Sequence, residues 1–494
     1  MSTPTRMSRP ASASPGSIAL PRAGGPGRLL ERWIAWADAL RAWAPPELSA
    51  RWGWTGLGLV VAAVVAVVAF STAGNSVLVP KSGVAFPGWE SGPAGWLFGH
   101  PSLPVGTLTI AYSGVLLLMV VAYALALLAA RNMSLRVIAA TAVAINLVLL
   151  LSPPLQLTDL FNYLGYARLG ALHGLNPYTH VINAETFDPV YRFSSWHNLP
   201  SPYGPLFTAL TYPLAFMSLP LAYWMVKVVT VAASLGFLWC VYKCARLLDL
   251  DPRPALVLIV ANPIYVFFAV GSFHNDFLML LPTTGAIALL LTRRDRAAGA
   301  VLMLAVAIKF SAVLLLPFLL MAARPPERRL RVLSGVLLAS VPLAALSIAL
   351  FGFSMPNLSE QSSVVTGYSI PNLLGLLVGL GGRTPGLMRV VDLALVVIVL
   401  WQLRRRDWLA GAGWATVALI AGTSWLMPWY IVWALPLAAL AANRRLRRAT
   451  LLLTLFLLFT FTPEVSTLLS SWGINPMSTQ VGRAASAYQT KLQR

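Results

Sequence analysis

Near residue 159, the sequence holds the side-chain types that proton transfer requires. Asp159 follows Thr158, and Tyr163, Tyr166 and His173 come after it at helical spacing. At about 100° per residue, Asp159 and these three side chains fall in one stripe of a helix. A carboxylate that faces a cavity can accept a hydroxyl proton as a general base. We predict that Asp159 is reactive; the alternative is that it caps the helix.

The opposite side of this predicted helix is apolar, so we expect it to lie along the membrane surface. Arg168 points with the apolar side, where its guanidinium could reach a lipid phosphate. Tyr163 and Tyr166 are predicted to bind substrate, with anchoring at the membrane interface as the alternative.

Two rigid turns follow the predicted helix. The first is Asn176-Pro177-Tyr178, and the second runs from Ser201 through Pro202, Tyr203 and Gly204 to Pro205. Rigid turns hold neighbouring side chains in fixed positions, which a reactive site requires. We therefore predict that Asn176, Tyr178 and Tyr203 bind substrate.

A second group of polar residues lies further along the chain. His274, Asn275 and Asp276 occupy a tight turn between two apolar runs, where the alternative is an ordinary polar hairpin. Lys309 stands among Ala307, Ile308 and Phe310, and a lysine in such a segment is costly unless it pairs or reaches the headgroups. We predict functional roles for His274, Asp276 and Lys309.

The elements that position these side chains must be membrane spans. The chain has 494 residues, of which 57% are hydrophobic and 11% are charged, far fewer charges than a soluble domain carries. We predict an all-α polytopic protein with about 13 transmembrane helices. The predicted spans are 54–72, 106–130, 137–152, 221–243, 254–270, 277–291, 332–351, 386–403, 408–427, 430–443 and 449–463, with two more passes in 299–322.

The arrangement of basic residues predicts the orientation. Residues 299–322 are flanked by arginines on both sides, so a hairpin that turns near Lys309 keeps both clusters in the cytoplasm, and residues 206–219 form a short re-entrant piece. Most of the 36 Lys and Arg residues then lie in cytoplasmic segments. All five histidines, Asp159 and Asp276 fall on the outer face of the plasma membrane, which predicts an extracytoplasmic site.

The remaining segments complete the predicted organisation. We expect a disordered basic cytoplasmic tail in 1–28, an interfacial amphipathic helix in 29–53, a transmembrane catalytic domain in 54–463 and an outer tail in 464–494. The net charge of +20 comes in short clusters between apolar runs, so nucleic acid is not the expected partner. Cys240 and Cys244 lie in an apolar segment and support no disulfide or metal framework.

Several motifs resemble those of the actinobacterial polyprenol-phosphate-mannose-dependent alpha-1,6-mannosyltransferases, membrane enzymes of the GT-C type. The resemblance covers about residues 150–435. Its motifs are Asp159-Leu160-Phe161-Asn162-Tyr163, Asn176-Pro177-Tyr178, Ser201-Pro202-Tyr203-Gly204-Pro205, His274-Asn275-Asp276, Ala307-Ile308-Lys309-Phe310 and Pro428-Trp429-Tyr430. Phe161 stands where the family often has Tyr, so a role of that phenol would not transfer.

The resemblance implies a polyprenyl-phosphate-mannose donor, a mannan or glycolipid acceptor in the outer leaflet, and Asp159 as the general base of an inverting transfer. Lys309, Arg168 and His274 are then expected to bind the donor phosphate, and Arg192 is a weaker candidate. The lipid tail is expected near 206–240. A divalent metal could be held by Asp159, Asp276 and His274, but no spacing requires one.

Two other classes of protein fit the spans. A transporter or flippase of a lipid-linked sugar would carry ionisable groups at the midplane of repeated halves. Asp392 is the acid predicted nearest the midplane, and the sequence shows no internal repeat. The other class is a scaffold of cell-wall assembly, for which the clustered outer carboxylates would have no use.

Overall fold

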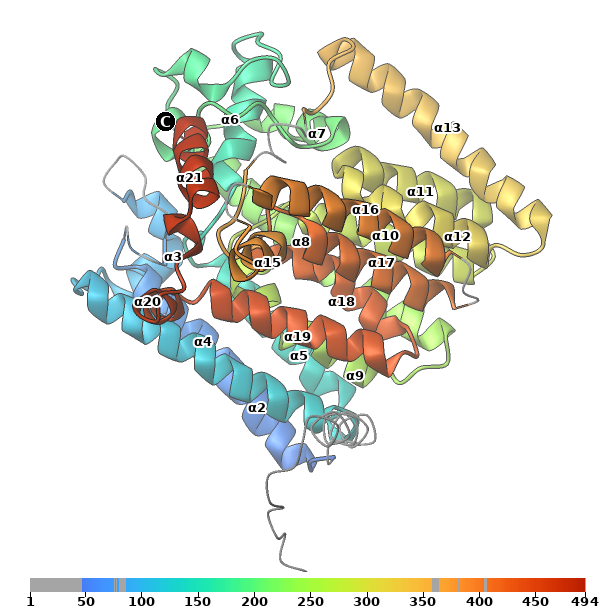
Figure 1. Ribbon diagram of the computed structural model, residues 1–494, viewed down its shortest axis with the longest axis horizontal. Helices are drawn as coiled ribbons and strands as arrows, with labels where there is room; N and C mark the ends of the chain where they lie inside the picture. Colours follow the sequence, from blue (N-terminus) through green and yellow to red (C-terminus); the bar gives the residue numbers. More distant parts are fainter. Residues whose placement is uncertain are drawn as a thin grey trace, which may run out of the picture. The chain divides into compact units, whose positions relative to one another are not determined.

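Every regular element of the described chain is a helix (Figure 1). The computed structural model describes residues 47–493, except 75, 77, 80–85, 358–363, 381–382 and 404–406. The expected all-α class is confirmed. The predicted tail 1–28 and most of the predicted interfacial helix 29–53 lie outside the described residues.

Four described helices are long and apolar enough to cross a membrane by themselves. They are α2 (Ala50–Ser71), α4 (Val105–Leu128), α8 (Leu219–Leu247) and α13 (Pro326–Phe351). Two bent pairs raise the number to six if each pair is one span. The pairs are α9 (Pro252–Val260) with η4 (Ile264–Val270), bent by 56°, and α19 (Arg444–Thr460) with α20 (Pro463–Ser471), bent by 78°.

The other apolar helices are shorter. They are α5 (Leu135–Leu150), α10 (Asp276–Leu291), η5 with α12 (Phe310–Leu315 and Leu316–Ala322), α17 (Trp408–Gly422) and η7 with α18 (Pro428–Tyr430 and Ile431–Leu440). A straight pass needs about 20 apolar residues. The described chain therefore has four to six candidate membrane spans, and the number of about 13 transmembrane helices stays a prediction.

The predicted turn at Lys309 is confirmed. Helix α11 (Asp295–Ile308) ends there, and Lys309 has extended backbone before η5 begins. Arg328, at the start of α13, donates to the carboxylate of Asp295 at the start of α11, with an Nη2–Oδ1 distance of 2.6 Å. The basic segments on either side of this hairpin therefore lie at the same end of the helix bundle.

Two glycines bring α11 and α13 into close contact. A Cβ atom on Gly299 would collide with the carbonyl oxygen of Val332, and one on Gly335 would collide with that of Arg296. Small residues at such positions let helix backbones approach within a membrane. The contact fixes α11, and with it Lys309, against α13.

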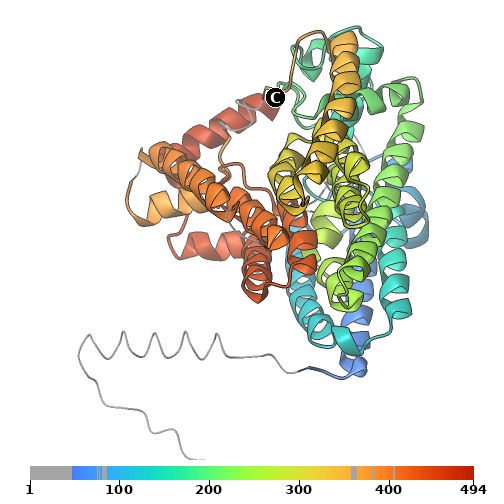
Figure 2. The same ribbon diagram turned by 90° about the vertical axis from the view of Figure 1, so that its right-hand side faces the viewer.

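The short helices α6 (Leu160–Ala171), α7 (Pro205–Ala215) and α21 (Gln480–Gln493) lie toward the top of Figures 1 and 2, and Asp159 directly precedes α6. Two more short helices are α3 (Gly88–Phe98) and α15 (Ile370–Leu377). Helix α5 runs from the loop that carries Arg131 toward the segment before Asp159, and Arg253 donates to the carbonyl of Met133 in that loop at 3.4 Å. Helix α16 (Thr384–Gln402) packs on α17.

Helix α6 differs from its prediction in one respect. Its existence and extent agree with the sequence pattern, but it does not lie on a membrane surface with one face free. Leu160 to Ala167 are all buried, because α7 and α8 pack against it. Of the stripe predicted to face a cavity, Asp159 and Tyr166 do line one, whereas Tyr163 is covered by Tyr203 and Phe207.

Candidate active site

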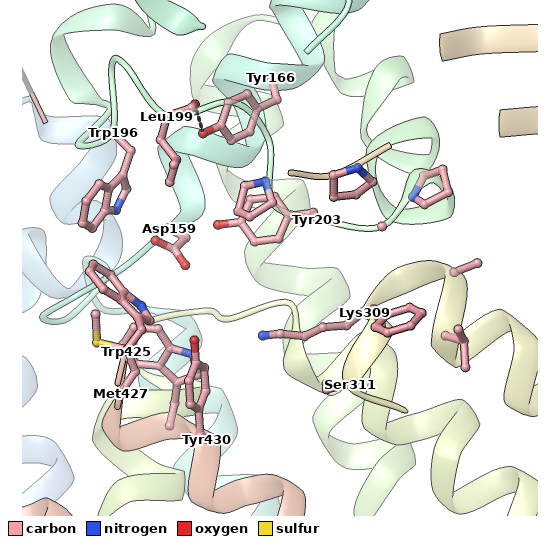
Figure 3. A pocket seen from close by; sticks show the side chains of 18 of the residues that line it. Asp159, Tyr166, Trp196, Leu199, Tyr203, Lys309, Ser311, Trp425, Met427 and Tyr430 are labelled. Carbon is pink, nitrogen blue, oxygen red and sulfur yellow. Dashed lines mark hydrogen bonds between the residues drawn. The ribbon is translucent and has the colours of Figure 1, made fainter. Parts of the chain in front are cut away.

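A cavity of about 1310 Å³ opens between the short helices and the hairpin at Lys309 (Figure 3). Its polar part is lined by Asp159, Tyr166, Tyr203 and Lys309, together with Trp196, Trp425 and Tyr430. Figure 3 shows Trp196 and Trp425 on one side of Asp159 and Lys309 on the other. Pockets of this kind, mostly apolar with a few convergent polar groups, are typical ligand sites.

Asp159 occupies the N-cap position of α6, but its side chain makes no capping hydrogen bond. The hydroxyl of Thr158 accepts the bond from the Leu160 amide instead, at 3.2 Å, and donates to the carbonyl of Ser272 at 2.7 Å. Thr158 thus anchors the start of α6 to the turn before His274. The carboxylate of Asp159, 17% exposed, is left to face the cavity.

His274 lies directly behind Asp159. Its Nδ1 is 3.6 Å from Oδ2 of Asp159, and its ring stacks on Trp429 with 3.8 Å between centroids. The imidazole is 1% exposed, and neither ring nitrogen has a hydrogen-bond partner in the described chain. His274 is not among the described residues that line the cavity, so its contact with a ligand would pass through Asp159.

Among the described residues that line the cavity, Lys309 is the one with a cationic side chain. Its Nζ is 2.8 Å from Oδ1 of Asp276, and it lies 5.6 Å and 5.2 Å from the ring centroids of Tyr430 and Trp433. Asp276 is fully buried, and the indole of Trp433 also donates to its Oδ1. The structure thus makes Asp276 the partner of Lys309 rather than a residue that lines the cavity.

The second predicted turn packs against the break at Lys309. Gly204 donates its amide to the carbonyl of Ile308 at 3.0 Å, and a Cβ atom on Gly204 would collide with the carbonyl oxygen of Ala307. Only glycine lets the two backbones approach this closely. The turn therefore holds Tyr203 and Lys309 in a fixed relation.

Three predicted tyrosines surround Asp159 in different ways. Tyr203 and Tyr166 line the cavity, and Tyr166 donates to the carbonyl of Leu199 at 2.7 Å. Tyr163 is buried between Tyr203 and Phe207, and its hydroxyl accepts from the Asn275 amide. Burial, followed by the charge of Asp159, raises the pKa of Tyr203 well above its ordinary value, so this phenol stays protonated.

Asn176 and Tyr178 have structural contacts. The side-chain amide of Asn176 donates to the carbonyl of Phe351 at 2.7 Å, and its oxygen accepts from the Tyr178 amide. The hydroxyl of Tyr178 donates to the carbonyl of Tyr203 at 2.9 Å. Neither side chain lines the cavity among the described residues. Tyr178 holds the turn that carries Tyr203, and Asn176 holds Tyr178.

Arg168 points away from the cavity and pairs with Asp188. Its Nε is 2.8 Å from Oδ1 of Asp188, whose other oxygen lies 2.8 Å from Nε2 of His173. Burial opposes ionisation of Asp188, but hydrogen bonds from Arg168, His173 and the Val190 amide outweigh it and lower its pKa. The donor-phosphate hypothesis therefore depends on Lys309 and not on Arg168.

Two tryptophans of the cavity were not predicted from the sequence. Trp196 packs edge to face on Trp425, with 5.3 Å between centroids. Asn162 holds this segment, because its side-chain oxygen accepts from the Ser195 amide at 3.0 Å. A signal was present, since Asn162 belongs to the Asp159 motif and is polar on an apolar face of the helix.

The apolar part of the cavity lies between α11, η5, α13 and α17. It is lined by Met303, Val306, Phe310, Val313, Leu343, Ala344, Ser347, Ile348, Leu419 and Ile420, among others. No described residue of 206–240 lines it, so this apolar lining is not the lipid groove expected near 206–240, which stays a prediction. The apolar lining continues directly from Lys309.

The residues considered for a divalent metal do not converge. Asp276 is held by Lys309 and Trp433, and His274 is stacked on Trp429. Within the described ranges, no three His, Cys, Asp or Glu side chains are placed to hold a metal ion.

Comparison with known proteins identifies the family. Residues 54–325 match the family model described as Alpha-(1->6)-mannopyranosyltransferase, N-terminal domain, and residues 365–489 match the MptB C-terminal domain. The chain belongs to the alpha-(1->6)-mannopyranosyltransferase family. It is accordingly a glycosyltransferase, and the matched ranges contain Asp159, His274, Lys309 and Trp425.

Curated relatives in the alpha-(1->6)-mannopyranosyltransferase family include mycobacterial proteins. The Mycobacterium tuberculosis alpha-(1->6)-mannopyranosyltransferase A is 26% identical over 359 residues, 66% of this chain and 69% of the relative. A probable alpha-(1->6)-mannopyranosyltransferase of Mycolicibacterium smegmatis is 28% identical over 370 residues, 62% of this chain and 66% of the relative. The alignments thus span about two thirds of these relatives. No solved structure matches the chain.

Proposed function

We propose that the protein transfers mannose from polyprenyl-phosphate-mannose to a mannan or glycolipid acceptor on the extracytoplasmic face, with inversion and with Asp159 as general base. One observation carries the proposal. A cavity-facing carboxylate lies opposite a lysine, and an apolar groove leads away from that lysine (Figure 3). This arrangement suits an amphipathic donor, with the phosphate at the lysine and the lipid in the groove.

Each side chain then has a defined task. Asp159 accepts the proton of the acceptor hydroxyl as the new glycosidic bond forms, and Lys309 compensates the negative charge of the departing polyprenyl phosphate. Tyr203, protonated at neutral pH, can donate a hydrogen bond next to Asp159. The aromatic lining of Trp425 and Tyr430 limits access of water to the reacting carbon.

The carboxylates of the site support the proposed inversion. Asp159 is the one carboxylate among the described residues that line the cavity, since Asp276 is buried beneath Lys309. Retention by double displacement requires a second carboxylate as nucleophile, about 5 Å from the first. A single displacement with Asp159 as base therefore fits this cavity better.

One further feature supports the membrane arrangement. The loops of Arg131 and Arg253 meet at the end of the bundle away from Asp159, and basic loops mark the cytoplasmic side. The short helices around Asp159 would then lie outside, as the GT-C type arrangement with about 13 passes requires.

The test is mannosyl transfer from polyprenyl-phosphate-mannose to a short mannan by purified protein, comparing wild type with Asp159→Asn. We expect the folded variant to lose at least about a hundredfold in kcat, as loss of a general base does. Tyr191→Phe, which removes a hydroxyl outside the cavity, is the control. Full activity of Asp159→Asn would remove the base assignment. No transfer from any polyprenyl-linked sugar by wild type would favour a carrier.

A further inference from the structure

The C-terminal helix α21 forms one wall of the cavity. Asn198 holds its last turn, because its amide N–H donates to the Leu492 carbonyl at 2.9 Å and its side chain donates to the Lys491 carbonyl at 3.1 Å. Leu492 is 5% exposed and belongs to the main hydrophobic core. Figure 1 shows α21 beside the segment that carries α6. The helix is therefore a built part of the site.

Two glutamines of α21 face the cavity. Gln489 and Gln493 are one turn apart, both are half-buried, and both line the cavity. Within residues 47–493, apart from the undescribed gaps, neither side-chain amide has a hydrogen-bond partner. Each amide therefore offers two donors and an acceptor to a ligand.

The two tryptophans supply an apolar surface in the same cavity. Trp425 is only 8% exposed, Trp196 is half-buried, and both line the cavity. A pyranose has an apolar C–H face and a rim of hydroxyl groups, so an aromatic ring can cover the face while neutral amides bind the rim. A lipid would use the aromatic surface but leave the amides unpaired.

We propose that Trp196, Trp425, Gln489 and Gln493 form the subsite for the sugar chain of the acceptor. The assignment rests on the proposed function, because an in-line displacement brings the acceptor from the side opposite the phosphate. Figure 3 places the tryptophans across Asp159 from Lys309. None of the four side chains is charged, so the subsite selects neutral hexoses.

The experiment compares wild type with Gln489→Ala/Gln493→Ala in two measurements. Initial rates give KM for a short alpha-linked mannose oligosaccharide and for the donor. Calorimetric titration gives Kd for the oligosaccharide without donor. We expect acceptor KM and Kd to rise about tenfold with donor KM unchanged, since each lost hydrogen bond contributes a factor of several. Thr490→Ala, exposed on the same helix, is the matched control.

Two outcomes separate this inference from the proposed function. Transfer by wild type with acceptor KM and Kd within about twofold in the double variant would overturn the subsite and leave the transferase intact. If wild type transfers no mannose, the proposed function fails, and the titration still decides the subsite: weaker binding in the double variant supports it, and equal binding overturns it. Trp196→Ala should weaken binding too, with Trp196→Phe restoring part of it.

Discussion

Lys309 and Asp276 carry opposite charges at the base of the cavity, and each depends on the other. Asp276 is fully buried, and Lys309 and Trp433 satisfy one of its oxygens. Removing the cation alone would leave a buried carboxylate without a counterion, which costs about 3–5 kcal/mol. A single substitution of Lys309 therefore mixes stability with function.

The paired substitution separates the two effects. We expect Lys309→Met to lower Tm and to raise donor KM more than acceptor KM. Lys309→Met/Asp276→Asn should recover most of the lost Tm, because no buried charge remains unpaired, while donor use stays impaired. Thermal unfolding in detergent and initial rates measure these effects. Recovery of donor KM together with Tm would show that Lys309 acts only as the partner of Asp276.

Residue spacing predicted part of the site and missed part of it for a definite reason. Helical periodicity correctly placed Asp159 and Tyr166 on one side of α6, since that depends on local geometry. Periodicity says nothing of what packs on that side. Tyr203 and Phe207 cover Tyr163, and Arg168 pairs with Asp188, which lies 20 residues further along the chain. Such contacts depend on the tertiary fold, which residue spacing does not specify.

At the scale of elements, the contact between the second turn and the α11 hairpin positions Lys309. Gly204 has a φ of −65°, which alanine also adopts, so only the space next to Ala307 forbids a side chain. We expect Gly204→Ala to destabilise the protein by about 1–3 kcal/mol. Its donor KM should also rise, because Lys309 would shift.

The matched control is Gly114→Ala in α4, where an added Cβ meets nothing within 4 Å. Thermal unfolding and donor titration of both variants make the comparison. Equal behaviour of the two variants would mean that the turn and the hairpin adjust without cost.

Helix α3 holds a buried acid that gives stability a pH dependence. Glu90 is 2% exposed, and burial, partly offset by the charge of Lys227, raises its pKa from 4.5 to about 7. The folded state thus binds more protons than the unfolded state between these two values. The protonated carboxyl group of Glu90 therefore makes its full contribution to the free energy of unfolding below about pH 4.5, and this contribution falls as the pH rises to about 7.

Glu90→Gln removes this titration and keeps the shape of the side chain. We expect its Tm to exceed that of wild type above pH 7 and to approach the wild-type value near pH 4.5. Glu327→Gln, at an exposed position in α13, should follow the wild-type profile. A Tm difference between Glu90→Gln and wild type that does not change with pH would exclude Glu90 as the titrating group.

At the scale of the whole molecule, the sequence predicted the helical class and the hairpin at Lys309, because apolar runs and basic clusters determine both. It did not predict where the groove lies. The groove forms where α11, α13 and α17 meet. Gly299 and Gly335 determine the contact between α11 and α13, and their importance shows only when the opposite backbone is known. The role of α21 depends in the same way on Asn198, far away in the sequence.

The position of the groove leads to a test of how the molecule holds the donor lipid. Ser347 is 6% exposed on the groove side of α13, whereas Val341 is 69% exposed on another side. Phenylalanine at 347 would fill the groove, and phenylalanine at 341 would not.

We expect Ser347→Phe to lower kcat/KM for a long-chain donor at least about tenfold and to leave kcat/KM for a short-chain analogue nearly unaffected, because only the long chain must pass the added ring. Val341→Phe should have the wild-type kcat/KM for both donors. If Ser347→Phe lowered the rates for both donors equally, the ring would be acting on the reacting groups, and the lipid would have to leave Lys309 by another route.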